Sequence, residues 1–332
     1  MTQIIAEIAQ AHEGSLGIAH SYIDALAETG VDVVKFQTHI ASAESSSDEQ
    51  FRVNFSYEDS TRFDYWKRME FTAEQWTGLK QHCEDENVEF MSSPFSVEAV
   101  ELLERLKVKR YKIGSGELTN YLMLDVIAKT GKPIILSSGM SDWNELDDTI
   151  KFLKNYNNHL TLLQCTTAYP TLPEQWGLNI MQEMNQRYNL PIGFSDHSAD
   201  IFACLAATTL GASILEFHAV FNHSMFGPDA IASLNINQIK QLVTGVKAIN
   251  TAQQTSGLKN DSSGFNSLKT MFGKSLATRL AVKKGLTIEL HQLESKKPGD
   301  RGIASKHFET IIGKTWNTDL AANIFINPND IK

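Results

Sequence analysis

The chain has 332 residues, of which 42% are hydrophobic and 21% are charged. These values are ordinary for a folded protein, and the length suits one large domain or a large domain with a small one. The formal net charge of −9, without a run rich in Lys or Arg, argues against a general nucleic-acid binder. An anionic substrate would therefore need a local cluster of cations.

The cysteines and the first residues indicate the compartment. Cys83, Cys165 and Cys204 lie far apart and form no CxxC pair. Their odd number, together with an N-terminus that goes directly into a strand-like pattern, favours a reducing cytoplasm. No apolar run approaches the length of a membrane span, so we expect a cytoplasmic protein without a transmembrane segment.

Strand and helix patterns alternate along the chain. A strand is predicted at 3–9, and the segment 15–30 has the apolar spacing of an amphipathic helix. Ser15 is a plausible N-cap of this helix, and Gly30 stands at its end.

A second strand at 31–38 precedes a polar stretch from about 40 to 70 that interrupts the alternation, and a helix follows at 71–87. The last helix of the series covers 235–254. About eight strand–helix units in about 250 residues predict a (β/α)8 TIM barrel. A doubly wound open sheet is the alternative, but no GxGxxG follows the first strand. The six other predicted strands are EFMSSP, RYKIGS, PIILSSG, LTLLQCT, PIGFSD and ILEFHA.

The composition changes after the last helix. Residues 255–274 are polar and rich in turn formers, whereas short apolar pieces separated by turns begin at about 275. We expect a barrel at 1–256, a linker at 257–274 and a compact β-rich module at 275–332. The module is small for independent stability, so we expect it to dock on something larger.

Nearly every predicted strand ends in polar side chains. Catalytic groups in a TIM barrel stand at the C-terminal ends of its strands, so a full ring of such residues predicts a polar pocket. The ring contains Glu7, Gln10, Lys35, Gln37, Ser92, Ser93, Lys112, Ser115, Ser137, Ser138, Thr166, Thr167, Ser195, Asp196, His197, Glu216 and His218.

Lys35 and Lys112 lie inside predicted strands, where lysine is disfavoured. Each is either a lysine at a strand end that extends to solvent or part of an anion site. A Schiff-base lysine of the aldolase type is also conceivable. Phosphate or carboxylate suits two lysines better, because hydroxyl groups that could complete an anion cradle are supplied by Ser93, Ser115, Ser137 and Ser195.

Two histidines follow neighbouring predicted strands. His197 and His218 would lie roughly 5 Å apart across adjacent strands of a closed barrel. They are either structural histidines or a divalent-metal site with open positions for water or a substrate oxygen. Glu216 is then a further ligand, an orienting partner of a histidine, or a partner of a lysine.

Other candidates lie near this rim, namely Asp196, Asp229 in FGPDA, and His12 in AHEGS. A two-ligand site suits polarisation of a carbonyl better than a closed structural zinc site does. Lysines for a phosphorylated acid opposite a metal for a carbonyl suggest the joining of two carbon fragments.

Ordered motifs along the chain then resemble a known family. EIAQAHEGS, DVVKFQTH, SSPFS, YKIGSGELTNY, KPIILSSGM, CTTAYPT, GFSDHS, GASILEFH and GPD resemble the sialic acid (N-acetylneuraminate) synthase family, over essentially the whole chain. This resemblance implies condensation of phosphoenolpyruvate with N-acetylmannosamine or a related amino sugar and water, giving a nonulosonic acid and phosphate by C–O cleavage. The C-terminal module resembles that family's antifreeze-like (SAF) domain.

The resemblance also implies roles for individual residues. It implies a divalent metal, typically Mn²⁺ with Mg²⁺ or Co²⁺ as alternatives, held by His197 and His218. It implies a catalytic group of Glu7, Lys35, Lys112 and His218. Phosphoenolpyruvate would contact Lys35, Ser93, Lys112, Ser115, Ser137, Thr167 and Ser195. The sugar would contact His12, Tyr169, Glu216, Asp229 and Lys297.

A homodimer in which each module caps the partner's barrel is implied as well. Three departures from the family pattern concern the sugar side: Ala11-His12, Thr167, and Lys297 where the family has an arginine, for which Arg301 is a nearby candidate substitute. The reaction is therefore better defined than the sugar, and legionaminate or pseudaminate synthases acting on a diacetamido-dideoxy sugar are close alternatives. A Schiff-base aldolase and a sugar-binding protein without catalysis are the alternatives from other classes.

Overall fold

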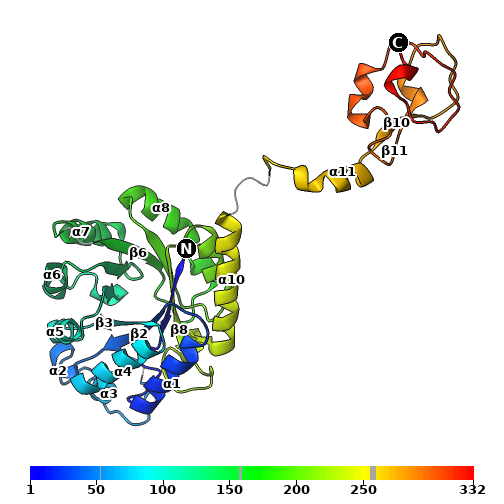
Figure 1. Ribbon diagram of the computed structural model, residues 1–332. Coiled ribbons are helices and arrows are strands. Elements are labelled where there is room, and N and C mark those ends of the chain that lie inside the picture. The colour runs from blue at the N-terminus through cyan, green and yellow to red at the C-terminus, as the bar shows by residue number, and fades with distance from the viewer. Residues whose placement is uncertain (53, 157–158, 255–258) are drawn as a thin grey trace. The chain divides into compact units, whose positions relative to one another are not determined.

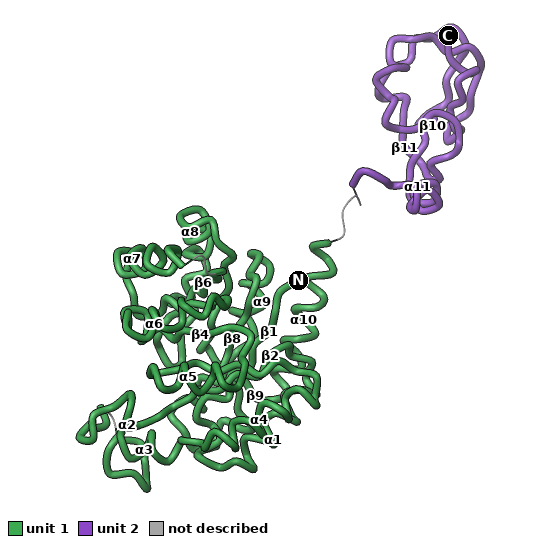
Figure 2. Tube along the Cα trace, turned by 60° about the vertical axis from the view of Figure 1, so that its left-hand side comes forward, with its two compact units in different colours: residues 1–254 green, residues 255–332 purple. Residues whose placement is uncertain are grey.

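The computed structural model describes residues 1–52, 54–156, 159–254 and 259–332. The chain forms two compact units, residues 1–254 and 255–332 (Figure 2). Residues 255–258, where the barrel was predicted to end and the linker to begin, lie outside the described residues.

The first unit is a barrel of eight parallel strands with helices around it (Figure 1). Neighbouring strands pair in the order β3-β2-β1-β8-β7-β6-β5-β4, and the two end strands β3 and β4 are in contact. The predicted (β/α)8 architecture is confirmed. The strands are β1 (Gln3–Glu7), β2 (Val33–Thr38), β3 (Glu89–Pro94), β4 (Tyr111–Ile113), β5 (Ile134–Ser137), β6 (Leu160–Cys165), β7 (Ile192–Asp196) and β8 (Ile214–Val220), with a short β9 (Leu234–Asn235) beside β8.

Helices follow the strands along the chain, as in other parallel barrels (Figure 1). Ser15 caps the first of them as predicted, accepting a hydrogen bond from the amide of Ile18. The polar stretch that interrupts the alternation contains two helices of its own, α2 and α3. The helices of this unit are α1 (Leu16–Ala27), α2 (Ala41–Glu44), α3 (Arg62–Met69), α4 (Ala73–Asp85), α5 (Val97–Arg105), α6 (Tyr121–Lys129), α7 (Trp143–Lys154), α8 (Leu178–Tyr188), α9 (Phe202–Thr209) and α10 (Ile236–Gln254).

The interior of the barrel changes from apolar to polar within one inward-facing layer along strands β1, β2, β3, β5, β6 and β8. On the side of the N-terminal ends of the strands, the interior is filled by a buried apolar cluster, which consists of Ile5, Val33, Met91, Ile135, Leu163 and Ile214. Side chains two positions apart on a strand point to the same face, so the residues two positions after this cluster also point inward and form the next layer toward the C-terminal ends of the strands. That layer contains Glu7, Lys35, Ser93, Ser137, Cys165 and Glu216. The strand register therefore places the polar residues on a rigid apolar base.

The second unit has a small core of its own. A two-stranded antiparallel sheet joins β10 (Ser275–Thr278) to β11 (Leu293–Lys296), and the rest consists of isolated bridges and short 3-10 turns. Within the predicted linker, Asn266–Phe272 forms helix α11, because NSLKTMF contains good helix formers and no Gly or Pro. The antifreeze-like identity of this unit stays a prediction. The core consists of Leu276, Val282, Ile288, Ile311, Trp316 and Ile326.

Across the described ranges, each helix is too short or too polar to cross a membrane.

Candidate active site

A cavity of about 830 Å³ opens at the C-terminal ends of the barrel strands. Its lining combines strand residues with side chains from the segment between β2 and α4. The predicted site residues that line it are Glu7, Lys35, Ser93, Lys112, Ser115, Ser137, Thr167, Tyr169, Ser195, His197, Glu216, His218 and Asp229.

Four ionisable side chains form the floor of the cavity: Glu7, Lys35, Lys112 and Glu216, which we call the floor cluster. Each is at most 4% exposed. Lys35 Nζ lies 2.5 Å from Glu7 Oε1 and 3.7 Å from Glu216 Oε1, and Lys112 Nζ lies 3.2 Å from Glu216 Oε1. Glu216 is therefore a lysine partner, one of the three roles predicted for it. Two carboxylates facing two ammonium groups keep the charge of this buried cluster balanced.

The charges of the floor cluster fix its protonation. Burial by itself raises the pKa of Glu7, but Lys35, His218 and Lys112 outweigh it and hold that pKa well below its ordinary range. Burial also lowers the pKa of Lys35, and the two carboxylates more than reverse this, so the pKa is raised. Glu7 is thus a carboxylate and Lys35 an ammonium group at neutral pH.

Hydroxyl groups border the floor cluster. Ser93 Oγ lies 3.3 Å from Lys35 Nζ, and Ser195 donates to Glu216 across 3.3 Å. Ser137 Oγ and Glu216 Oε2 are buried and have no hydrogen-bond partner among the described residues. Buried polar atoms are normally paired, so these two atoms are suited to contact a polar ligand.

The two predicted histidines face each other on one wall. The ring centroids of His197 and His218 are 5.4 Å apart. His218 lies 3.5 Å from a Glu7 oxygen through Nε2 and 3.7 Å from an Asp229 oxygen through Nδ1. Glu7 and Asp229, rather than Glu216, are therefore the carboxylates beside this imidazole.

His197 has the arrangement typical of a metal-binding histidine. Its Nδ1 donates to the Thr166 carbonyl across 3.0 Å, which leaves Nε2 facing the cavity, 3.1 Å from the Tyr169 hydroxyl. Burial lowers the pKa of His197, but Cys165 and the Thr166 carbonyl outweigh it and raise the pKa to about 9. A cation at Nε2 would displace that proton, so these two histidines and their neighbouring carboxylates fit a divalent metal.

Two predicted sugar contacts do not belong to this lining. His12 is 1% exposed, accepts a hydrogen bond from the Gly14 amide across 3.0 Å, and lies against Phe71 instead of among the cavity residues described. Lys297 belongs to the second unit, where its ammonium group lies 5.0 Å from the centre of the Phe272 ring.

One part of the wall was missed at the sequence level. The segment 41–70, of which all but residue 53 is described, contributes to the lining, and we call it the rim segment. The signal was its length, because a long insertion after a barrel strand lies on the catalytic face. The cavity-lining residues of the rim segment are Glu44, Glu49, Phe51, Arg52, Phe55, Arg62, Tyr65 and Trp66.

Arg68 anchors the rim segment to the barrel. Its guanidinium contacts Asp59 at 2.9 Å and Glu13 at 3.0 Å. Gly14 packs so tightly on this anchor, with φ +74°, that a Cβ would lie 2.3 Å from the Arg68 carbonyl oxygen. Thr61 and Asp64 form a capping box that starts α3 next to it.

Comparisons with known proteins identify the family. The family model described as NeuB matches residues 22–257, which include the barrel strands from β2 to β8. This chain belongs to the NeuB family. The relationship to sialic acid synthases predicted from the ordered motifs is thereby confirmed.

Relatives of this NeuB-family chain cover it almost from end to end. It is 34% identical to the N,N'-diacetyllegionaminic acid synthase of Campylobacter jejuni, over 94% of this chain and 95% of the relative. It is 30% identical to the pseudaminic acid synthase of Helicobacter pylori, over 99% and 98%. The crystal structure of an N-acetylneuraminic acid synthetase from Leptospira borgpetersenii, in complex with citrate, is similar with a TM-score of 0.70 and 26% identity, over 80% and 90%.

Proposed function

We propose that this NeuB-family chain condenses phosphoenolpyruvate with an N-acetylated amino sugar, N-acetylmannosamine being the first candidate, to give a nonulosonic acid and phosphate. The observation that carries the proposal is the buried floor cluster beside a pair of facing histidines. In the reaction, C3 of phosphoenolpyruvate bonds to the sugar aldehyde carbon. The oxygen of water then adds to C2, and the C2–O bond to phosphate breaks.

The lysines of the floor cluster would hold the anionic substrate. Lys35 and Lys112 are buried cations, and such cations bind phosphate and carboxylate strongly because water screens them little. Ser93, Ser115, Ser137, Thr167 and Ser195 would supply further hydrogen bonds. The buried Ser137 hydroxyl, with no partner among the described residues, supports this assignment directly.

Glu7 would act as an ionised group. Because its pKa is held well below the ordinary range, it is a poor proton donor at neutral pH. A fixed carboxylate at the floor stabilises positive charge that develops at C2 when C3 attacks the aldehyde. We therefore assign to Glu7 an electrostatic role and not that of a general acid.

His197 and His218 would hold a divalent cation, for which Mn²⁺ is the first choice and Mg²⁺ or Co²⁺ are alternatives. Such an ion supplies Lewis-acid polarisation of the sugar aldehyde. Tyr169 and Asp229, which contact the two imidazoles, then lie where they can orient the hydroxyl groups of the sugar.

The state of Lys35 argues against an aldolase that works through a Schiff base. A nucleophilic lysine needs a lowered pKa, whereas two carboxylates raise the pKa of Lys35. Lys112 is likewise paired with a carboxylate, at 3.2 Å.

A diacetamido-dideoxy sugar, as in legionaminate or pseudaminate synthesis, is the second candidate. The rim segment supports it, because Phe51, Phe55 and Trp66 give the cavity an apolar wall that suits a sugar with fewer hydroxyl groups. The names of two relatives, an N,N'-diacetyllegionaminic acid synthase and a pseudaminic acid synthase, point the same way.

We further propose a homodimer in which the second unit, as an antifreeze-like domain, caps the partner's cavity and brings Lys297 to the sugar. Lys297→Ala would then raise the KM for the sugar and leave the KM for phosphoenolpyruvate unchanged. An unchanged sugar KM would remove Lys297 from the site.

The decisive experiment is release of inorganic phosphate from phosphoenolpyruvate in the presence of Mn²⁺ and a panel of amino sugars. We expect release that requires both a sugar and the metal, and none after treatment with a chelator. Absence of release with every sugar in the panel, from a folded protein loaded with Mn²⁺, would refute the proposed reaction. The sugar that gives the highest kcat/KM decides between the two candidates.

A further inference from the structure

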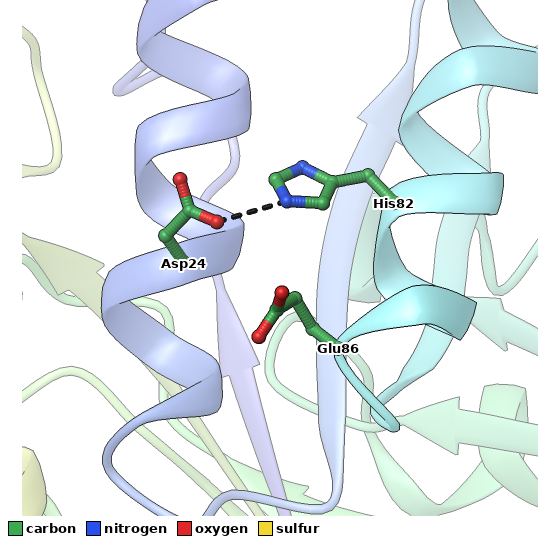
Figure 3. A group of neighbouring side chains, drawn as sticks. All are labelled: Asp24, His82 and Glu86. Carbon is green, nitrogen blue, oxygen red and sulfur yellow. Dashed lines mark ion pairs between the residues drawn. The ribbon is translucent and has the colours of Figure 1, made fainter.

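A second group of metal-ligating side chains lies between α1 and α4. His20 and Asp24 are four positions apart on α1, as are His82 and Glu86 at the end of α4. Side chains four positions apart lie on the same face of a helix. Asp24, His82 and Glu86 offer ligand atoms that all lie within 4.8 Å of one another, and Figure 3 shows all three facing the gap between the helices.

Both ring nitrogens of His82 are oriented by neighbours. Nδ1 lies 2.8 Å from Nδ1 of His20, and Nε2 lies 2.8 Å from Oδ1 of Asp24. When His82 donates from Nδ1 to His20, its Nε2 lone pair faces the oxygens of Asp24 and Glu86. In this tautomer the lone pair lies next to carboxylate oxygens and needs a cation between them. In the other tautomer Nε2 carries a proton and donates it to Asp24, while Nδ1 accepts from His20.

The surroundings favour the metal ion. A metal-bound imidazole characteristically donates its other N–H to an acceptor, and Nδ1 of His20, 2.8 Å from Nδ1 of His82, is placed to be that acceptor. The His82 side chain is 21% exposed, so the site is accessible to an ion from solvent while the ring stays fixed. One imidazole and two carboxylates are suitable ligands for zinc, and they leave a coordination position for water.

We propose that Asp24, His82 and Glu86 bind a divalent transition-metal ion of the zinc type, with His20 as the residue that positions His82. The site is separate from the cavity, whose lining includes none of these residues. A bound ion would join α1 to α4. Helix α1 follows β1, which carries Glu7, and α4 precedes β3, which carries Ser93. The ion would therefore stabilise this side of the barrel.

The test is Zn²⁺ binding by the full-length chain in a background in which the cavity histidines are removed (His197→Ala, His218→Ala). Equilibrium dialysis at neutral pH should give one Zn²⁺ per chain, and Zn²⁺ should raise the Tm. Adding His82→Gln should abolish both effects, and Glu86→Gln should weaken binding at least about tenfold through loss of one ligand. Asp85→Asn is the matched control, since this neighbour bonds instead to Gln81 at 2.9 Å, and it should leave Zn²⁺ binding unchanged.

Two further readouts keep the result independent of folding and of the proposed reaction. Co²⁺ substituted for Zn²⁺ should give a visible ligand-field spectrum that His82→Gln removes while circular dichroism stays the same. His82→Gln in the otherwise native chain should retain turnover, because His82 does not line the cavity. Equal Zn²⁺ binding with and without His82 would place the ion elsewhere, and no binding in the background chain would mean a histidine–carboxylate ion pair only. Either result would overturn the proposal.

Discussion

The floor cluster and the rim segment are two parts of one cavity that are built in different ways. The floor consists of charged side chains that are at most 4% exposed and come directly from barrel strands. The rim comes from an insertion between β2 and α4, and it is aromatic and partly exposed, with the Arg62 side chain 43% open to solvent.

This difference suits the floor and the rim to different tasks. Strand register fixes the floor, because Glu7, Lys35 and Glu216 each follow an apolar residue by two positions on a rigid strand. The rim depends on a few anchors, chiefly Arg68 and its carboxylate partners. We therefore expect the floor to carry the chemistry common to the family and the rim to choose the sugar, since loops on a rigid scaffold determine specificity.

The largest loss should follow removal of a histidine from the cavity wall. We expect His218→Ala to reduce kcat by about 10³-fold or more, because carbonyl polarisation would be lost, with the fold retained. Steady-state phosphate release and circular dichroism check both points. His223→Ala is a matched control outside the lining, and turnover by His218→Ala equal to that of the control would contradict a role for this wall.

A smaller but still large loss should follow replacement of a floor lysine. Lys112→Met leaves Glu216 with one lysine partner at 3.7 Å, so we expect kcat/KM for phosphoenolpyruvate to fall about 10²-fold. Breaking a buried pair also costs roughly 3 kcal/mol of unfolding free energy. Adding Glu216→Gln should recover most of that stability and none of the activity. Recovery of activity in the double variant would mean that Lys112 acts only by neutralising Glu216.

The rim should affect the sugar alone. Trp66 stacks on His39 at 4.2 Å between ring centroids, and Arg62 lies 5.0 Å from its ring centre. We expect Trp66→Ala to raise the KM for the sugar about tenfold and to leave the KM for phosphoenolpyruvate unchanged. Trp143→Ala is the matched control, because Trp143 also has an arginine near its ring, Arg187 at 4.9 Å, and lies outside the cavity lining. Equal changes in both Michaelis constants would show that floor and rim do not act separately.

The two parts also differ in how far the sequence predicts them. The floor follows from local rules, because charged residues inside strands such as VVKFQT and ILEFHA must meet at one end of a parallel barrel. The pairing of Glu216 with lysines rather than with His218 depends on which side chains meet across the barrel, which one strand cannot reveal. The rim has no periodic sequence pattern that would predict its structure. Its position depends instead on the contacts of Arg68 with Asp59 and Glu13.

The smallest effect should be a difference in acid sensitivity between the floor and the contact of His12 with Phe71, which lies next to the rim segment. Burial, with the nearby charges of His39 and Arg68, lowers the pKa of His12 to about 3, and His12 packs on Phe71 next to the rim segment. The unfolded chain binds this proton near pH 6.5 and the folded chain does not, so stability falls as pH drops through that range. From pH 7 to 5.5 the His12 contribution should fall by about 1 kcal/mol.

His12→Asn isolates this contribution, because its amide oxygen can still accept from the Gly14 amide. In urea unfolding at pH 7 and pH 5.5, the variant should lose about 1 kcal/mol less than the wild type does. The floor should not contribute, since the depressed pKa of Glu7 means that its stabilisation is complete above its ordinary pKa and is lost only as pH falls below that range. Equal pH slopes for the two proteins would show that His12 is protonated in the folded chain, and its contact with Phe71 would then be no more sensitive to acid than the floor.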